Sequence, residues 1–265
     1  MNTQNHIKDS KYMKFKQFTN MKKILFSMLA LLFLVACNPH DNENQFLSDF
    51  TSIATVENPN QTSGFYFKLD NNDRMWITST YFPYYSPKTG QRIIANYSIL
   101  SVNNNGTTYN HKVQLNDVYE VLTKGIFNIT PATQDSIGND QISIRDIWIG
   151  SDYLNVEFTY LGYNKIHYIN LVTDTAKKYT DSKIHLEFRH NANGDYATYS
   201  KGGIASFKLD SLQTNTTVDS VNLVIHSKEF GTPTDKTYNL TYKFGKLGSS
   251  NIKKMLFPAN NEKIQ

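Results

Sequence analysis

The sequence predicts an all-β protein with two domains, a small five-stranded barrel followed by a β-sandwich. Beyond residue 36 the apolar residues recur mostly with period two, and Tyr, Phe, Ile, Val and Thr are abundant. No stretch of that region keeps an apolar face at helical spacing. The predicted strands also fall into two groups, separated by a turn-rich segment that contains Pro131 and Gly138.

The amino-terminal segment is predicted to be a signal peptide. Two lysines precede an apolar run at residues 24–35, which is too short to span a bilayer, since spanning takes about 20 apolar residues. The run ends in Leu34-Val35-Ala36-Cys37, which resembles the lipobox of bacterial lipoproteins, where the cysteine receives diacylglycerol. We therefore expect residues 1–36 to be a signal peptide with an overcalled start, and Cys37 to be the lipidated first mature residue.

An ordinary signal peptide followed by a free thiol is the alternative to lipidation. Cys37 is the one cysteine in the chain, however, and it stands where a lipobox requires it. Lipidation would leave the mature chain without a thiol for a disulfide or a cysteine-based metal site. We expect a lipid-anchored protein of the cell envelope, at the outer membrane, and the sequence leaves open which side of the membrane it faces.

Removal of the signal peptide changes the charge balance. Residues 1–36 contain six of the 27 basic residues and one of the 23 acidic residues, which leaves 21 basic and 22 acidic residues in the mature chain. Nucleic-acid binding depends mainly on Lys and Arg that neutralise phosphates. A nearly neutral mature chain therefore argues against a nucleic-acid partner.

The first domain is predicted at residues 48–130, after a polar tether at residues 37–47 that follows the lipid. Asp70-Asn71-Asn72-Asp73 and Asn103-Asn104-Asn105-Gly106 supply turn residues between neighbouring strands, so each flanking pair should form a hairpin. Five strands in about 80 residues are typical of an OB-type barrel. The predicted strands are residues 51–57, 64–70, 74–78, 92–102 and 109–122.

The second domain is predicted at residues 131–248, and residues 249–265 are expected to be a disordered tail. Seven short strands at intervals of roughly 8–15 residues indicate a two-sheet, immunoglobulin-like sandwich. These strands are residues 141–149, 153–160, 165–172, 183–190, 204–209, 220–227 and 237–244.

Several blocks of the mature chain resemble, in order, the NigD-like lipoprotein family. They are residues 52–59 (SIATVENP), 90–92 (GQR), 124–126 (KGI), 135–140 (DSIGND), 146–150 (DIWIG) and 185–191 (HLEFRHN). The resemblance implies an amino-terminal OB domain followed by a β-sandwich, which agrees with the strand count. The family takes its name from a component of a bacteriocin gene cluster and is associated with immunity, while most relatives lack an assigned activity.

No catalytic motif stands out in the sequence. It contains no G-x-S-x-G, H-E-x-x-H, phosphate-loop or EF-hand pattern, so we expect neither an enzyme nor a bound cofactor or metal. His185, Glu187 and Arg189 share one face of a predicted strand. Because the arginine would repel a metal ion and a third ligand is not evident, a wet sheet face with a Glu–Arg pair is favoured over a metal site.

The segment Tyr81-Phe82-Pro83-Tyr84-Tyr85 holds four aromatic residues in five positions. These side chains could close one end of the barrel or form a recognition surface, and the sequence favours the plug. A mixed arrangement is predicted, with Phe82 pointing inward and Tyr84 and Tyr85 outward, because a tyrosine hydroxyl must find water or a partner.

Trp76 on the third strand is expected to share an outward barrel face with Arg74 and with Tyr66 on the second strand. OB domains use this face for oligonucleotides or sugars. The candidate partner-binding residues are therefore Trp76, Tyr81, Phe82, Tyr84 and Tyr85.

The sequence thus predicts a non-catalytic, monomeric envelope lipoprotein that binds a partner. The favoured hypothesis is a bacteriocin-immunity-type or accessory factor with a protein partner. The alternative is a carbohydrate-binding or glycan-binding module of a surface assembly, since the aromatic barrel surface could stack on sugars.

Overall fold

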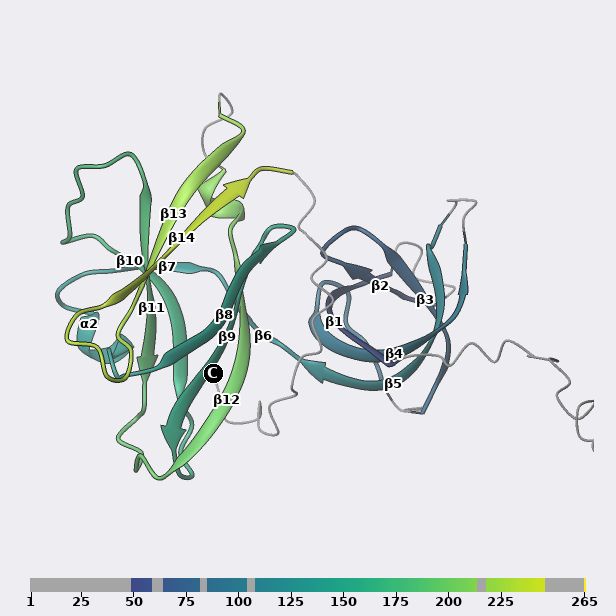
Figure 1. Cartoon of the computed structure of the whole chain (residues 1–265), viewed down its shortest axis with the longest axis horizontal. Coiled ribbons are helices and arrows are strands. Elements are labelled where there is room, and N and C mark those ends of the chain that lie inside the picture. Colours follow the sequence, from purple (N-terminus) through teal and green to yellow (C-terminus); the bar gives the residue numbers. More distant parts are fainter. Residues whose placement is uncertain (1–48, 59–63, 82–84, 104–107, 214–217, 246–264) are drawn as a thin grey trace, which may run out of the picture. The chain divides into compact units, whose positions relative to one another are not determined.

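The computed structural model describes residues 49–58, 64–81, 85–103, 108–213, 218–245 and 265 (Figure 1). They belong to one compact unit, Leu47–Gln265. The predicted signal peptide, Cys37, the tether and nearly all of the predicted tail lie outside the described residues. Within the described ranges, no helix has both the length and the apolar character needed to cross a bilayer.

The first domain is a closed five-stranded barrel, as the sequence predicts (Figure 1). The strand order around the barrel is β1-β2-β3-β5-β4, in which β3 and β5 run parallel and the other neighbours run antiparallel. Closure leaves no free sheet edge in the barrel. The strands are β1 (Asp49–Glu57), β2 (Tyr66–Leu69), β3 (Arg74–Thr80), β4 (Arg92–Val102) and β5 (His111–Glu120).

The barrel interior is filled by the alternate residues that period two places on one face. Phe67 and Met75 are fully buried, and they lie opposite each other on β2 and β3. The predicted hairpin between these strands is present, and Asn72 takes the left-handed conformation (φ 69°) that asparagine tolerates in turns. The remaining core residues of the barrel are Ala54, Val56, Leu69, Ile93, Ala95, Tyr97, Val113 and Leu115.

The second domain is a two-sheet sandwich (Figure 1). One sheet has five strands in the order β14-β13-β11-β10-β7, and the other has four in the order β6-β12-β9-β8. Its elements are β6 (Leu122–Lys124), β7 (Ile126–Ile129), α2 (Gln134–Ile137), β8 (Ser143–Gly150), β9 (Tyr153–Gly162), β10 (Tyr168–Asp174), β11 (Ile184–Asn191), β12 (Tyr199–Lys208), the 3-10 turn η1 (Asp210–Leu212), β13 (Ser220–Ser227) and β14 (Lys236–Lys243).

The sandwich differs from the predicted seven-stranded, immunoglobulin-like one. The described residues form nine strands, and three neighbouring pairs, β6–β12, β7–β10 and β11–β13, run parallel. The two extra strands, β6 and β7, lie within the segment that the sequence assigned to the end of the first domain. They are short, and each pairs with a strand far along the chain. The alternation of apolar and polar residues within the segment was therefore too brief to predict them.

The domain boundary accordingly lies earlier than the predicted position near Thr130. β5 ends at Glu120, and β6 already belongs to a sandwich sheet. Val121 is therefore the only residue between the last barrel strand and the first sandwich strand. It is buried, and its amide donates to the carbonyl oxygen of Arg92 at 2.9 Å.

Each domain has its own hydrophobic core, as predicted, and a third apolar cluster includes residues of both domains. In that cluster Ile53 and Ile94 of the barrel pack with Ile204 of the sandwich. Val121 completes the buried set, and Trp148 packs against it. The short connection between the domains is thus part of a packed apolar contact.

A buried ionic network accompanies this third cluster. The Arg92 guanidinium, whose side chain is 0% exposed, donates to both carboxylate oxygens of Asp70 at 2.6 and 3.0 Å. It also donates to the side-chain oxygen of Asn155 at 3.0 Å, which accepts from the Ser206 hydroxyl at 2.6 Å. A Cβ atom on Gly150 would lie 2.0 Å from Asp70 Oδ2, so only glycine leaves room for this carboxylate.

Candidate functional site

The outer face of the barrel carries a row of three aromatic side chains. Tyr66 on β2 lies opposite Trp76 on β3, and their ring centroids are 4.8 Å apart. Tyr109, which precedes β5, stacks on the other side of Trp76 at 6.3 Å. All three side chains are partly exposed. We call Tyr66, Trp76 and Tyr109 the aromatic row.

Charged groups border the aromatic row. Arg74 Nε donates to Glu57 Oε2 at 3.0 Å, and Lys68 Nζ lies 3.6 Å from the other carboxylate oxygen of Glu57. Lys112 Nζ lies 5.9 Å from the Tyr109 ring centroid. Such exposed pairs contribute little to stability, about 0–1 kcal/mol. They leave the aromatic row with a polar border that can form hydrogen bonds.

The structure places Trp76, Arg74 and Tyr66 on one outward face, as the sequence predicts. Gly64, with φ +95°, passes so close to the indole that a Cβ atom there would lie 2.8 Å from Trp76 Cη2. The sequence analysis missed Tyr109 as a member of this face. Tyr109 could have been recognised from its position at the start of the predicted strand 109–122, which in the structure pairs with the strand that carries Trp76.

The predicted aromatic segment is only partly described, because Phe82 and Tyr84 lie outside the described residues. Tyr81 is 70% exposed. Tyr85 packs against the barrel core instead, with its ring edge-on to Phe65 at a centroid distance of 6.3 Å. Burial, with the nearby charge of Glu120, raises the pKa of Tyr85 to about 12.

The outward orientation predicted for Tyr85 is therefore wrong. Its hydroxyl is buried without a hydrogen-bond partner in the described structure. The apolar area of the ring outweighs the cost of leaving this one polar group unsatisfied, which is about 1–3 kcal/mol. Tyr85 therefore packs against the barrel core, as the plug hypothesis requires. Trp76, by contrast, lies beside Tyr66 and Tyr109 on the outer face of the barrel.

The outer face of β11 carries His185, Glu187 and Arg189, as predicted, but this face is not wet. Glu187 is 4% exposed and Arg189 is 5% exposed. Arg189 Nε donates to Glu187 Oε2 at 2.7 Å, and Lys177 Nζ donates to Glu187 Oε1 at 2.6 Å. The predicted Glu–Arg pair is present. Its exposure was wrongly predicted, because Glu187 is bound by Lys177 from the preceding loop and Arg189 donates to the carbonyl oxygen of Gly138, 51 residues away.

His185 also takes part in a chain of hydrogen bonds. Its Nε2 lies 2.8 Å from Asp181 Oδ1, and its Nδ1 lies 2.9 Å from His226 Nε2. The Tyr179 ring stacks on His185 at 3.6 Å. The two imidazole nitrogens are too close together for a metal ion between them. In the described part of the chain, no group of three or more His, Cys, Asp or Glu side chains could hold a metal.

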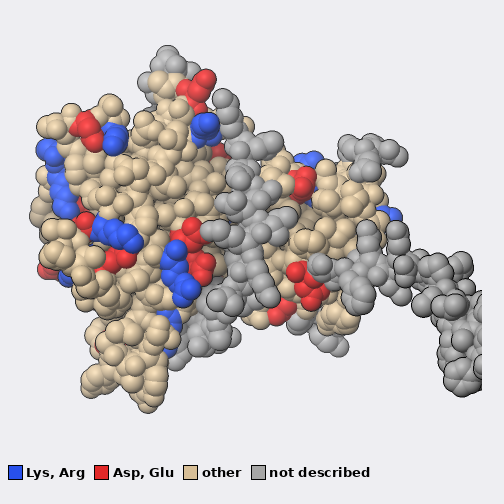
Figure 2. All heavy atoms as spheres, in the orientation of Figure 1, with Lys and Arg blue, Asp and Glu red and all other residues tan. Residues whose placement is uncertain are grey.

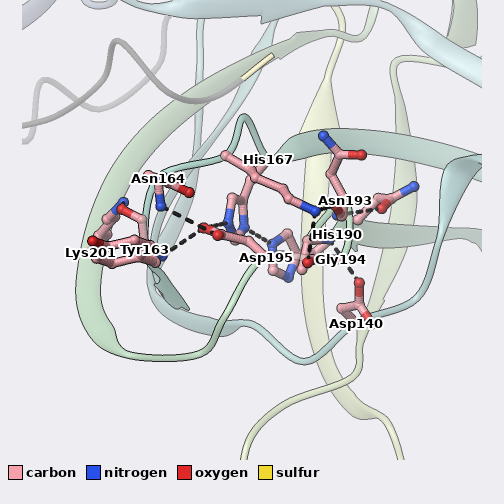
Figure 3. Close-up of polar contacts among 12 residues, drawn as sticks. Asp140, Tyr163, Asn164, His167, His190, Asn193, Gly194, Asp195 and Lys201 are labelled. Atoms are coloured by element: carbon pink, nitrogen blue, oxygen red, sulfur yellow. Dashed lines mark hydrogen bonds and ion pairs between the residues drawn. The ribbon is translucent and has the colours of Figure 1, made fainter.

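A second chain of the same kind is buried inside the sandwich (Figure 3). Asp195 Oδ2 lies 3.1 Å from His167 Nε2, and His167 Nδ1 lies 2.7 Å from His190 Nε2. The chain ends where His190 Nδ1 meets the carbonyl oxygen of Gln141 at 3.0 Å. The side chains of His167 and Asp195 are both 0% exposed. The Tyr160 ring packs on His167 at 4.5 Å.

Hydrogen-bond geometry and burial assign the donor and the acceptor nitrogen of His190 in this chain. The Gln141 carbonyl can only accept, so His190 donates from Nδ1, and burial lowers the pKa of His190 to about 4, which leaves its Nε2 as an acceptor. His167 must then donate from Nδ1. Burial alone would raise the pKa of Asp195, but the amides of Tyr163 and Asn164 and the His167 ring hold it well below its usual range. The other ring nitrogen of His167, Nε2, faces the Asp195 carboxylate.

This network joins two loops at one end of the sandwich (Figure 3). Asp195, in the β11–β12 loop, accepts from the amides of Tyr163 and Asn164 in the β9–β10 loop, at 2.6 and 3.3 Å. In the other direction, Lys165 Nζ donates to the carbonyl oxygens of Asn193 and Gly194 at 3.1 and 2.9 Å. The β11–β12 loop turns at Asn193 and Gly194, which both have positive φ.

The Asp–His–His arrangement resembles a proton relay in its connectivity, but its position does not suit catalysis. Its side chains are buried, and it ends on the main-chain carbonyl of Gln141 rather than on a nucleophile. Its chemical effect is to fix the positions of two loops. The sequence signals for it were His190, at the end of the predicted strand 183–190, and Asp195 five residues later, whereas nothing local pointed to His167 as their partner.

Two family models match the chain. The NigD-like N-terminal OB domain matches residues 53–121, and the NigD-like C-terminal beta sandwich domain matches residues 125–242. These limits agree with a boundary between the domains just after β5. The comparison with curated proteins finds no match.

Solved structures with the same fold come from related bacteria. A protein of unknown function from Bacteroides vulgatus is 29% identical, with a TM-score of 0.68 over 82% of this chain and 100% of that one. A protein named as toxin-related from Parabacteroides distasonis is 32% identical, with a TM-score of 0.61 over 74% of this chain and 93% of that one. A NigD-like immunity protein from Bacteroides caccae, at 20% identity and a TM-score of 0.59 over 73% and 96% of the two chains, shares the fold. Together with the two family models, these similarities show that the chain belongs to the NigD-like family.

Proposed function

We propose that this protein is a non-catalytic, lipid-anchored protein of the cell envelope that binds a protein partner through the aromatic row of its barrel. The observation that carries the proposal is the row of neighbouring rings formed by Tyr66, Trp76 and Tyr109 on an outward face, in which Trp76 and Tyr109 stack and Tyr66 is tilted against Trp76. Tyrosine and tryptophan are enriched among the residues that dominate binding energy at protein interfaces. The lipobox at Cys37 supports attachment to the membrane.

The surroundings of the aromatic row fit a partner surface. Glu57, Lys68, Arg74 and Lys112 give it a charged border of mixed sign, and protein interfaces combine an aromatic centre with a polar rim. Charges of both signs favour a folded partner with a complementary pattern over a uniformly charged polymer.

If the protein has an immunity-type role, its partner is a toxin protein. One structure that shares the fold is named as a NigD-like immunity protein and another as toxin-related. An anchored protein that intercepts a secreted toxin needs no active site, only a surface held at the envelope. We therefore propose a bacteriocin-like protein as the partner, with an accessory role in a surface assembly as a variant of the same binding function.

Glycan binding is the second candidate, and the aromatic row also favours it. Aromatic rings on the outer face of an OB barrel can stack on sugar rings, and the border residues could bind sugar hydroxyls. Both candidates place the ligand on the same face, so the class of ligand has to be determined by binding.

The experiment uses the full-length chain expressed in envelope-bearing cells with its own signal. A candidate bacteriocin-like protein is added to cells that carry the wild type, Cys37→Ala or Trp76→Ala. Phe230→Ser, at an exposed aromatic residue away from the barrel, is the matched control. Membrane fractionation and cell survival are measured together, and purified wild type and Trp76→Ala are assayed for toxin and glycan binding.

We expect Cys37→Ala to leave the washed membranes, because the acyl chains supply about 0.8 kcal/mol per buried CH₂. Trp76→Ala should stay anchored and folded but bind the toxin at least about tenfold more weakly. Retention of Cys37→Ala in membranes would contradict the anchor. Unchanged toxin binding by Trp76→Ala would contradict the site, and loss of glycan binding alone would favour the second candidate.

A further inference from the structure

The first part of β10 has a strand neighbour on one side only. β10 pairs with β11 from Tyr168 to Val172, but on its other side β7 pairs with it only from Leu171 to Asp174. The chain enters β7 from β6, which belongs to the opposite sheet and pairs with β12. Because Gly125 alone separates β6 from β7, the chain joins β10 only at Leu171 and leaves the beginning of β10 unpaired on this side.

Gln265 forms main-chain hydrogen bonds with this part of β10. Its amide donates to the carbonyl oxygen of His167 at 2.8 Å, and its carbonyl oxygen accepts from the amide of Ile169 at 2.7 Å. The two bonds reach the residues on either side of Tyr168, which is the pattern of a parallel strand pair in which Gln265 lies beside Tyr168. Gln265 therefore supplies the parallel neighbour that β7 provides further along β10.

Lys124 limits this site to a short segment. Its ammonium donates to the carbonyl oxygen of Ile169 at 3.0 Å and to the side-chain oxygen of Asn170 at 2.9 Å. In a continued parallel ladder, the carbonyl of Ile169 would accept from an amide two residues further along the docked segment. Lys124 takes the place of that amide. Burial lowers the pKa of Lys124, which fits an ammonium that has exchanged water for these two oxygens.

Main-chain bonds, rather than charge, define what this site accepts. His167 offers an acceptor and Ile169 offers a donor, at the spacing of an extended main chain. Figure 2 shows basic and acidic side chains interspersed over the visible face of the sandwich, so that face has no uniform charge that would attract a charged ligand. The site therefore suits an extended segment of polypeptide that runs in one direction.

The length of the chain allows its own carboxy-terminal region to be the occupant. β14 ends at Lys243, and Gln265 lies beyond β10, four strand spacings from β14 in the sheet order. Four spacings amount to about 19 Å. The roughly 20 residues between Lys243 and Gln265 can span about 70 Å when extended, so the connection within one chain is long enough.

We propose that the first part of β10, together with Lys124, is a docking site for one extended segment in parallel orientation, and that the segment of this chain that contains Gln265 is its occupant. The docked segment holds the main chain of His167, whose ring belongs to the buried chain with Asp195 and His190. It also denies this edge to a strand of another protein, since free strand edges are sites of strand addition. The proposal is independent of the aromatic row.

Disulfide trapping in the full-length chain tests the identity of the occupant. The background is Cys37→Ser, which contains no other cysteine. Neighbours in a parallel pair have Cα atoms within the range of about 4.4–6.8 Å that a disulfide needs, so Tyr168→Cys/Gln265→Cys should oxidise within one chain. Val102→Cys/Gln265→Cys is the control, because Val102 is 59% exposed but lies at the end of β4 in the barrel. We expect the first pair to oxidise at least about tenfold faster.

Amide hydrogen exchange in the full-length chain tests the main-chain bonds. Gln265→Pro removes the amide that donates to His167, whereas Gln265→Ala keeps both main-chain bonds. We expect the Ile169 amide to exchange at least about tenfold faster in Gln265→Pro than in the wild type, and within about threefold of the wild type in Gln265→Ala. The amides of β13, which has strand neighbours on both sides, should exchange equally in all three proteins.

Each arm has an outcome that contradicts the proposal. Unchanged exchange at Ile169 in Gln265→Pro would overturn it, and so would equal oxidation of the two cysteine pairs. Disulfide-linked dimers formed by Tyr168→Cys/Gln265→Cys would overturn the assignment of the occupant in favour of a segment from a second copy. Rapid oxidation within one chain, together with loss of protection at Ile169 in Gln265→Pro alone, supports docking of the chain's own segment.

Discussion

His190 is the residue whose protonation state the fold controls most clearly. Its ring is buried against Tyr160 and His167, its Nδ1 faces the Gln141 carbonyl, and its Nε2 faces His167 Nδ1. A proton on His190 Nε2 would remove the acceptor that this ring offers to His167 Nδ1. The neutral ring is thus built into the native structure.

Acid should therefore destabilise the protein before its carboxylates are protonated. The folded pKa of His190, about 4, lies below the unfolded value of about 6.5. Stability from the neutral ring is fully present above pH 6.5 and is lost as the pH falls towards 4. Between pH 7 and pH 5 we expect the free energy of unfolding to fall by about 2 kcal/mol from this residue.

Urea titrations at several pH values can measure this loss. His190→Leu removes the titrating group, so its unfolding free energy should vary less over the same interval even if the variant is less stable at pH 7. His226, whose pKa is lowered by burial and by the nearby His185, supplies the slope that remains. A variant as steeply dependent on pH as the wild type would contradict the assignment.

The histidine chains show what the sequence could not predict at the residue scale. Alternation on β11 correctly placed His185, Glu187 and Arg189 on one face of the strand. The partners of His185 and His190, which are His226 and His167, lie 41 and 23 residues away in the sequence. Hydrogen bonds over such separations depend on strand order, which period two does not encode.

At the scale of elements, the connections between strands were harder to predict than the strands themselves. β4 and β13 match their predicted limits, and the inward residues of β2 and β3 follow from alternation. The sequence did not reveal that the segment after β10 covers Glu187 and Arg189. In the sequence, the polar residues of a loop that covers a charged side chain cannot be told from those of an exposed loop. The burial of a charge can be recognised only when the position of its partner in the fold is known.

The segment that leads from β3 to β4 offers a direct test with a matched pair of tyrosines. Tyr85→Ala should lower the free energy of unfolding by about 2 kcal/mol, because the ring packs against the barrel core. Tyr81→Ala, at a side chain that is 70% exposed, should change it by no more than about 0.5 kcal/mol. Chemical denaturation of both variants measures the difference, and equal losses would show that Tyr85 is not part of the plug.

At the scale of the whole molecule, the sequence predicted the order and class of both domains. It misplaced the boundary because strand β6 follows β5 after Val121 alone, without the turn residues that usually mark a linker. It also gave no sign of the buried contacts between Arg92, Asp70 and Asn155. These residues lie in three different elements, and a lone charged residue in a strand pattern is more often exposed than paired.

The last prediction concerns that network. Asp70→Ala removes the carboxylate that accepts two hydrogen bonds from the buried Arg92, and an unpaired buried charge costs about 3–5 kcal/mol. Glu57→Ala, which removes the exposed pair with Arg74, is the control and should cost at most about 1 kcal/mol. Adding Arg92→Met to Asp70→Ala should recover part of the loss, because no charge then remains buried.

Calorimetric unfolding of the four proteins measures these differences. A loss below about 1 kcal/mol in Asp70→Ala would mean that water reaches the guanidinium and that the ion pair behaves like a surface pair. A double variant less stable than Asp70→Ala would mean that the contact of the Arg92 guanidinium with the Tyr153 ring, at 4.3 Å from Cζ to the centroid, contributes more than the buried charge costs. Recovery in the double variant would instead show that the pair acts chiefly by satisfying a charge that the contact between barrel and sandwich has buried.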